Sequence, residues 1–206
     1  MSSSLTGDIS NSDRDPSDLP IYDHTYIVYG YNMRRSHAEA IHNHGHQLEA
    51  MFSYAAWLQD GNSDLFWKQF VGQDPQGNFV TGRAGWTHMP PNTTGHYDYL
   101  NNTLVESDIE DWTPDNSGEK KLINAFTWAN LEYAWPDGRV DELNGNVEPE
   151  DAIWQQTESQ WYIYWMQSMP GFNNEIKYFG DLEMQNWWEL VADWDSAISE
   201  QRGLHE

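Results

Sequence analysis

Aromatic residues dominate the apolar part of this chain. Its 206 residues include 12 Trp, 11 Tyr and 7 Phe, which make up 15% of the sequence, while hydrophobic residues of every kind reach only 38%. A chain so poor in aliphatic residues and so highly charged would normally remain disordered. Each aromatic ring, however, buries on the order of 150–250 Å². The sequence therefore predicts a folded domain whose core or cleft is built largely from rings.

The charge balance narrows the range of partners. Asp and Glu number 33 against 10 Lys and Arg, which gives a formal net charge of −23. Nucleic acids and anionic membranes attract clustered positive charge, so we expect neither as a partner. Dense carboxylates keep a protein solvated in salt, and we expect an extracellular or secreted protein, with the cytoplasm of a halophile as the alternative. Residues 1–20 lack the pattern of a signal peptide.

Length and cysteine content limit the architecture. At roughly 150 residues per domain, the sequence predicts a disordered tail over residues 1–20, rich in Ser, Asp and Asn, and a single globular domain over residues 21–206. Cysteine is absent, so a metal site would need His and carboxylate ligands. The motifs of serine hydrolases, phosphate-binding loops and dinucleotide-binding folds are missing as well, which argues against those classes.

Hydrophobic periodicity predicts a helix-dominated α+β fold. We expect a short strand over residues 22–31 and a long N-terminal helix, which carries the histidines, over residues 33–58. A large ordered loop region rich in aromatic residues should follow over residues 61–118. Three further helices are expected over residues 119–134, 149–168 and 185–201.

The long N-terminal helix concentrates metal-ligand side chains. At about 100° per residue, Glu39, His42, His46 and Glu49 share one stripe that borders the apolar face. Two histidines at i and i+4 present their imidazoles to one metal, and a carboxylate one turn later can complete a set of three ligands. The candidate ligands are therefore His42, His46 and Glu49, and the expected ion is Zn²⁺.

Two alternatives compete with this site. On a strand, His42, His44 and His46 would all face one side, but the flanking residues are strong helix formers and favour the helix. On that helix His44 points away from the stripe. The second alternative is a helix whose histidine-rich edge is simply solvated.

The helix segment resembles the zinc-binding HExxH helix of zincin-type metallopeptidases, with His42 and His46 matching the two ligand histidines. The resemblance implies zinc-dependent hydrolysis of a peptide or amide bond. Asn43 stands where that family has its general-base Glu, and an amide cannot take a proton from bound water. The base must then come from elsewhere, and Glu39 or a loop residue are the candidates.

A second group of reactive side chains lies in the aromatic loop region. Pro90 and Pro91 stiffen the backbone and Gly85 permits a turn, so His88 is expected on a rigid loop that reaches a site on another element. We predict that His88 serves as an acid and base or as a further ligand, with Asp98 as its partner. Glu39 and His88 are thus the candidate catalytic residues. The alternative is a surface loop with one packed histidine.

Loop aromatic residues are the candidates for substrate contact. Indole faces stack on sugar rings, and Asp and Asn side chains bond sugar hydroxyls. The tryptophans of the last helices follow core spacing instead. The substrate-binding candidates are Trp86, Tyr97, Asp98 and Trp112.

An acidic cluster nearby offers a further alternative. Asp108, Glu110 and Asp111 supply carboxylates that suit Ca²⁺, although the spacing of an EF-hand is missing.

Two functions follow from these patterns. The first is a metal-binding, zinc-dependent hydrolase-like domain that acts on a peptide or amide substrate. The second is a non-catalytic module that binds glycans or another surface, with a structural metal or none. The position of His88 relative to His42 and His46 distinguishes a site from a chance pattern, because ligands of one ion must converge within a few Å.

Overall fold

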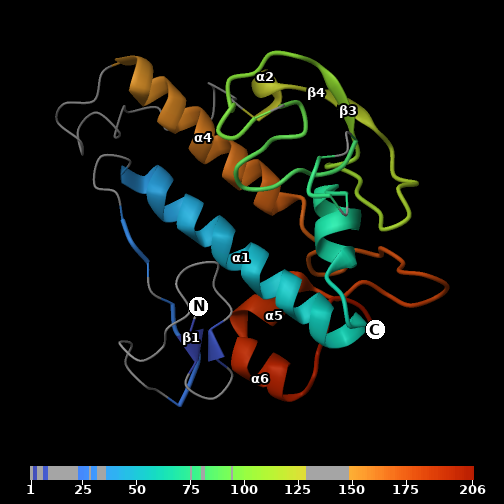
Figure 1. Ribbon diagram of the computed structural model, residues 1–206. Helices are drawn as coiled ribbons and strands as arrows, with labels where there is room; N and C mark the ends of the chain where they lie inside the picture. The colour runs from blue at the N-terminus through green and yellow to red at the C-terminus, as the bar shows by residue number, and fades with distance from the viewer. Residues whose placement is uncertain are drawn as a thin grey trace.

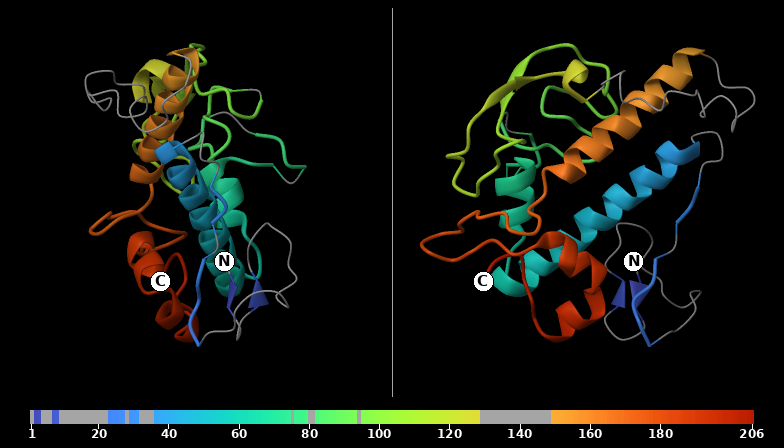
Figure 2. Two further views of the ribbon diagram at one scale, coloured as in Figure 1. Left: turned by 90° about the vertical axis from the view of Figure 1, so that its left-hand side faces the viewer. Right: turned by 180° about the vertical axis from the view of Figure 1, so that it is seen from behind.

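Two long helices form the centre of the molecule. Helix α1 (Ser36–Asp60) and helix α4 (Pro149–Gln167) lie side by side and run in the same direction (Figure 1). Views from the side and from behind show the loop region covering α4, with the C-terminal helices against the end of α1 (Figure 2). The computed structural model describes residues 2–3, 7–8, 23–27, 29–31, 36–74, 76–79, 82–93, 95–128 and 149–206.

Short elements surround this helix pair and complete a helix-dominated α+β fold. Strands β3 and β4 pair antiparallel, with Val105 opposite Ile123 and Ser107 opposite Lys121. No helix in the described part has the length and hydropathy needed to cross a bilayer. The remaining bounds are β1 (Ser2–Ser3), β2 (Gly7–Asp8), the π-helix η2 (Leu65–Val71), β3 (Val105–Ser107), β4 (Lys121–Ile123), α2 (Ala125–Trp128), α5 (Trp187–Ala192) and α6 (Trp194–Ser199).

The core is built from rings, as the composition predicts. Trp187 lies at its centre, with ring centroids 4.9 Å from Phe52 of α1 and 5.3 Å from Phe70 of η2. Edge-to-face and tilted pairs of this kind add to the stabilisation from burial. The largest fully buried side chains are Trp161, Trp165, Trp187, Tyr99, Tyr162, Phe52, Phe66, Phe70, Leu48, Met51, Leu65 and Ile109.

Some predicted elements differ from the observed ones. The helix expected over residues 119–134 is wrong at its start, because residues 121–123 form β4, and α2 covers only residues 125–128. Pairing with β3 favours the strand, in which Leu122 is exposed and Ile123 is buried. Residues 129–134 lie outside the described residues.

The last predicted helix is divided into α5 and α6. Asp193 leaves the helical conformation, with φ of −128° and ψ of 46°, and its carboxylate pairs with Arg202 at 2.6 Å. The break lets α6 turn back, so that Trp194 and Ala197 are buried along with Trp187 and Leu190.

The N-terminal predictions are met only in part. Within residues 23–27 and 29–31, where a strand was expected, only Tyr26 forms a β-bridge. Within the expected tail, Ser2–Ser3 pairs antiparallel with Gly7–Asp8, and residues 9–20 lie outside the description. The loop region expected over residues 61–118 also holds η2 and β3.

A buried ion pair organises the loop region. The side chain of Arg83 is bonded to the carboxylate of Asp108, and both residues are buried. Arg83 also donates to the carbonyl of Thr113 at 2.8 Å and to Oδ1 of Asn116 at 3.0 Å, and it lies 5.7 Å from the centroid of Trp112. Burial raises the pKa of Asp108 to about 6, against the opposing charge of Arg83.

The suggested Ca²⁺ cluster is engaged in other contacts. Asp108 faces Arg83, and Glu110 accepts a hydrogen bond from Lys121 at 2.6 Å and from Tyr164 at 2.9 Å. Asp111 accepts a bond from the backbone of Glu119 at 2.6 Å. These carboxylates serve as partners of cations and donors of the fold, so the Ca²⁺ alternative loses its support.

Gly45 is the point of closest approach between α1 and the loop region. A Cβ atom added at Gly45 would lie 2.7 Å from Oγ1 and 3.0 Å from Cγ2 of Thr87, which is fully buried. Glycine inside a helix costs about 1 kcal/mol relative to alanine. Here its absence of a side chain lets the loop that carries Thr87 and His88 reach the helix.

Gly45→Ala is therefore expected to destabilise the protein by about 1–3 kcal/mol, although alanine is the better helix former, because overpacking against Thr87 outweighs the gain in helix propensity. Urea unfolding measures the change. Adding Thr87→Ala removes the two closest atoms and should recover part of the loss. A Gly45→Ala variant more stable than the parent would contradict the close approach.

Candidate metal centre

Three histidines from two elements meet at one point. His42 and His46 lie one turn apart on α1, and His88 comes from the loop after η2. Their Nε2 atoms form a triangle with all three sides 2.9 Å long. The three residues are the group of potential metal ligands found within the described part of the chain. His42 is buried, whereas His46 and His88 are half-buried.

The triangle has the size of one face of a metal coordination shell. With metal–nitrogen bonds of about 2.0–2.1 Å, nitrogens 2.9 Å apart would make N–metal–N angles of about 90°. His42, His46 and His88 would hold such an ion from one side. Three protein ligands and an open side are the arrangement of a catalytic rather than a closed structural site.

The hydrogen bonds behind His42 orient its imidazole. Tyr162 of α4 donates its hydroxyl proton to Glu158, and its oxygen lies 3.2 Å from His42 Nδ1. Glu158 Oε1 lies 3.4 Å from the same nitrogen. Burial raises the pKa of the Tyr162 phenol, so it stays protonated. Because both neighbouring oxygens accept, the Nδ1 atom carries the proton and Nε2 presents a lone pair.

A carboxylate holds His46 in the same way. Glu49 Oε2 lies 2.7 Å from His46 Nδ1, and Glu49 Oε1 accepts a bond from the backbone of Thr87 at 3.1 Å. Glu49 is buried. One side chain thus fixes the tautomer of His46 and ties α1 to the residue that precedes His88.

The His88 loop is held by α4. The backbones of Trp86 and Met89 exchange two hydrogen bonds of 3.1 Å, which closes the turn that displays His88. Trp165 donates its indole N–H to the carbonyl of Gly85 at 3.0 Å, and Trp161 donates to the carbonyl of Trp86 at 3.2 Å. Two tryptophans of α4 therefore fix the backbone on which the third histidine stands.

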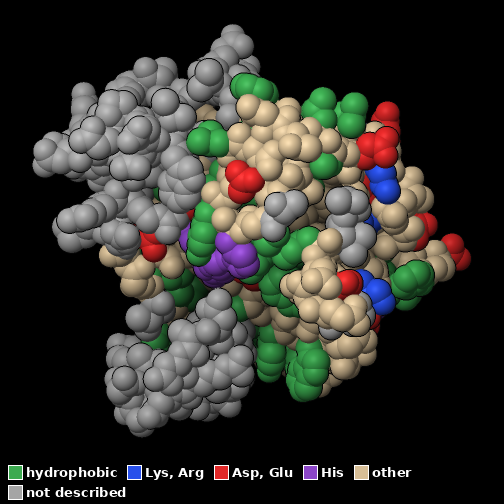
Figure 3. Space-filling view, turned by 45° about the horizontal axis from the view of Figure 1, so that its top comes forward, with side chains coloured by type: hydrophobic (Ala, Val, Ile, Leu, Met, Phe, Trp, Pro, Cys, Tyr) green, Lys and Arg blue, Asp and Glu red, His purple; other side chains and the backbone are tan. Residues whose placement is uncertain are grey.

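Aromatic residues line the outer side of the histidine cluster. Trp86 stacks on Phe79 with 5.8 Å between centroids, and its ring lies 4.9 Å from that of His88. Tyr97 lies 4.5 Å from His88 on another side and is 41% exposed. The surface view shows histidine side chains beside hydrophobic ones (Figure 3).

Only some of the residues predicted as ligands or catalytic groups meet at the triangle of Nε2 atoms. His42, His46 and His88 converge, whereas Glu49 lies behind His46 instead of joining the Nε2 atoms. Glu39 is half-buried on α1, one turn before His42. Asn43 donates to the carbonyl of Gly30 at 3.0 Å, so it faces the N-terminal segment.

The predicted substrate residues divide into two groups. Trp86 and Tyr97 border the histidines, whereas Asp98 accepts a bond from Asn101 at 2.7 Å within its own turn. Trp112 is only 3% exposed and packs 5.3 Å from Phe70 in the core.

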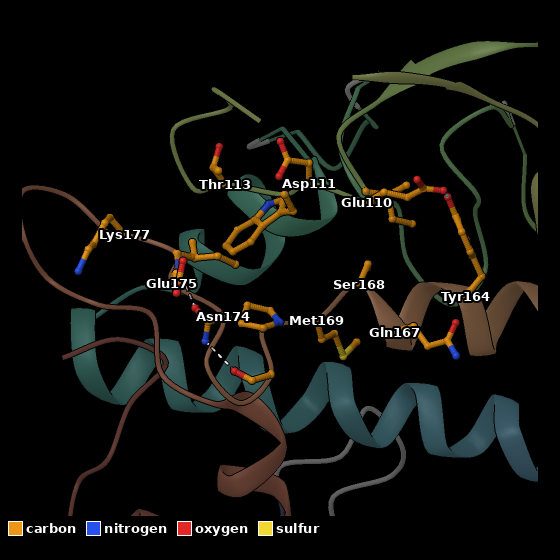
Figure 4. A pocket seen from close by; sticks show the side chains of 15 residues that line it. Glu110, Asp111, Thr113, Tyr164, Gln167, Ser168, Met169, Asn174, Glu175 and Lys177 are labelled. Carbon is orange, nitrogen blue, oxygen red and sulfur yellow. Dashed lines mark hydrogen bonds between the residues drawn. The ribbon is translucent and has the colours of Figure 1, made fainter. Parts of the chain in front are cut away.

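Trp112 also lines a separate cavity of about 560 Å³ (Figure 4). This cavity lies among the loop after β3, the end of α4 and the loop after α4, and Glu110, Tyr164 and Asn174 contribute to its wall. Trp112 therefore lies at this cavity and not beside the histidine cluster.

Sequence reasoning missed Glu158 and Tyr162. They lie on α4, far along the chain from His42, in a helix whose tryptophans follow core spacing. Nothing in that spacing indicates that a buried carboxylate and phenol face a histidine of another helix. The available signal was a Glu and a Tyr at i and i+4, which places both side chains on one side of the helix.

Comparison with known proteins assigns no function, so the functional assignment depends on this geometry. No family model, characterised protein or solved structure matches the chain. The histidine cluster is accordingly the feature on which a functional conclusion depends.

Glu49→Gln tests the role assigned to Glu49. The amide retains one acceptor oxygen for two donors, so either His46 or Thr87 loses its bond. We expect metal affinity to fall about 10- to 100-fold, the usual effect of removing such a supporting group. Competition with a chelating dye measures it, and Glu106→Gln, at an exposed position of β3, is the matched control. Unchanged affinity would show that Glu49 does not orient His46.

Proposed function

We propose that His42, His46 and His88 bind one Zn²⁺ ion and that this centre hydrolyses a peptide or amide bond. The observation that carries the proposal is the convergence of three Nε2 atoms at 2.9 Å. Two of the rings have acceptors at Nδ1, so their Nε2 lone pairs point at one another. Such lone pairs repel unless a cation lies between them.

The open side of the centre suits hydrolysis. A Zn²⁺ ion held by three protein ligands would lower the pKa of a bound water to about 7 and polarise a substrate carbonyl. The low exposure of His42 and the surrounding rings keeps water away from the protein side of the ion, which strengthens its field. Trp86 and Tyr97, on the outer side, supply apolar contact for a substrate.

Glu39 is the proposed proton acceptor. It lies on α1 one turn before His42, on the stripe that carries both helix ligands. Asn43, at the position of the zincin general base, cannot accept the proton and is bonded to Gly30. His88, the other catalytic candidate, is assigned to the metal instead. The likeness to zincins is thus limited to His42 and His46, with a third ligand from a loop.

Metal analysis and turnover test the proposal together. Purified protein should contain one zinc per chain and release product from peptide or amide substrates, and a chelator should stop the reaction. Glu39→Gln should keep the zinc and lose about 10²- to 10⁴-fold in kcat, whereas Glu106→Gln should lose nothing. Bound zinc without turnover of any amide or peptide would leave a structural metal, and binding to a glycan array without metal would support the rival function.

A further inference from the structure

Tyr97 brings its hydroxyl close to the Nε2 atom of His88. The phenol oxygen lies 3.3 Å from His88 Nε2, the same atom that faces His42 and His46. Ligand atoms of one ion, at bonds of about 2.0–2.1 Å, are separated by roughly 2.9–3.4 Å. The phenol oxygen therefore stands from His88 at the separation expected of a further ligand.

The backbone of Tyr97 is held in an unfavourable conformation. Its φ is 67°, in the left-handed region that bulky residues avoid. Its N–H donates to the carbonyl of His88 at 2.8 Å, which fixes the two residues relative to each other. With 41% of the residue exposed, burial alone does not account for this placement. Strained residues of this kind gather at binding and catalytic sites.

We infer that the Tyr97 phenol oxygen is the fourth protein ligand of the ion that the three histidines bind. The inference rests on the proposed metal centre and specifies its resting state. On coordination the O–H bond breaks and the proton passes to solvent, which leaves a phenolate on the metal. The ring is attached to an exposed turn, while the histidines are fixed by α1 and α4. Tyr97 is thus the ligand that a substrate carbonyl or water displaces.

Copper provides a direct probe of this ligand. Cu²⁺ has a high affinity for imidazole sites, and a phenolate bound to it produces a charge-transfer band in the visible region. Protein loaded with one Cu²⁺ should show this band, and resonance Raman excitation in the band should enhance phenolate modes. Tyr97→Phe should lose both signals and bind Cu²⁺ about tenfold more weakly. Tyr54→Phe, a half-buried tyrosine on α1 that packs on Trp57, is the matched control.

The outcomes separate this inference from the proposed function. If the wild-type protein binds one Cu²⁺ without the band, or if Tyr97→Phe retains the band, Tyr97 is not a ligand and the three-histidine centre stands. If the wild-type protein binds no Cu²⁺ or Zn²⁺, the centre itself is wrong and the inference falls with it. The Raman measurement uses the wild-type protein, so it decides the point even if Tyr97→Phe fails to fold.

Discussion

Replacing His42 with alanine is expected to abolish stoichiometric zinc binding. The variant removes one of three converging nitrogens and leaves Tyr162 and Glu158 facing an empty volume. Losing a ligand should cost more than the roughly 10- to 100-fold typical of supporting groups. Zinc at a thousandfold excess over its Kd stabilises a folded protein by about 4 kcal/mol. The wild-type Tm should therefore rise with zinc, and the His42→Ala Tm should not.

His44→Ala is the control for this prediction. His44 lies on the same helix, but its Nδ1 contacts Gln47 at 2.9 Å and it does not belong to the cluster. Its metal content and zinc-dependent Tm should match those of the wild type. If His42→Ala retains one zinc per chain, or if both variants lose it equally, the assignment of ligands is wrong.

The second large effect is expected at the buried ion pair. Arg83→Met should destabilise the protein by about 3–5 kcal/mol, because it leaves the carboxylate of Asp108 buried without its counterion. Asp108 is fully buried, and its Oδ1 atom has no hydrogen-bond partner among the described residues. Urea unfolding measures the loss. The double variant Arg83→Met with Asp108→Leu should recover much of it, because no charge then remains to be buried.

The loss in Arg83→Met should depend on pH in a defined direction. Burial raises the pKa of Asp108 to about 6 even with Arg83 present, and removing that cation raises it further. In this window the folded state binds more protons than the unfolded state, so stability falls as the pH rises. Arg83→Met should accordingly be more stable at pH 5 than at pH 7.5, relative to the wild type at each pH.

A surface pair provides the comparison. Lys121 and Glu110 form an ion pair of 2.6 Å in which both side chains are partly exposed. Exposed pairs contribute little to stability, so Lys121→Met should change stability far less than Arg83→Met. An equal effect of Lys121→Met and Arg83→Met would show that burial is not the cause.

The predictable part of the fold is the part with strong local periodicity. The helix that contains His42 and the helix that begins at Pro149 follow from apolar spacing, and the aromatic core follows from composition. The β3–β4 pair does not, because Val105 and Ile123 meet only through the fold. The break at Asp193, whose carboxylate pairs with Arg202, is not revealed by helical periodicity.

Part of the site was also predictable from local features of the sequence. His42 and His46 share a helix face by geometry alone, and the stiff Pro90–Pro91 loop indicated that His88 could reach them. Whether Glu49 binds the ion or supports His46, which does, depends on the direction of the Glu49 side chain. Glu49 and His46 are neighbours on the helix, and Glu49 faces the Nδ1 side of His46 and the backbone of Thr87, a contact between elements that the sequence does not reveal.

The indole contacts of Trp161 and Trp165 with the His88 loop imply an order of events. These donors fix the backbone of the His88 loop through residues outside the histidine cluster, so the loop is in place without a metal, and the ion would only have to draw the Nε2 atoms together. Binding then requires little loss of chain entropy. Small zinc domains that are unfolded without metal behave in the opposite way. We expect this protein to complete its fold first and the proposed metal to bind afterwards.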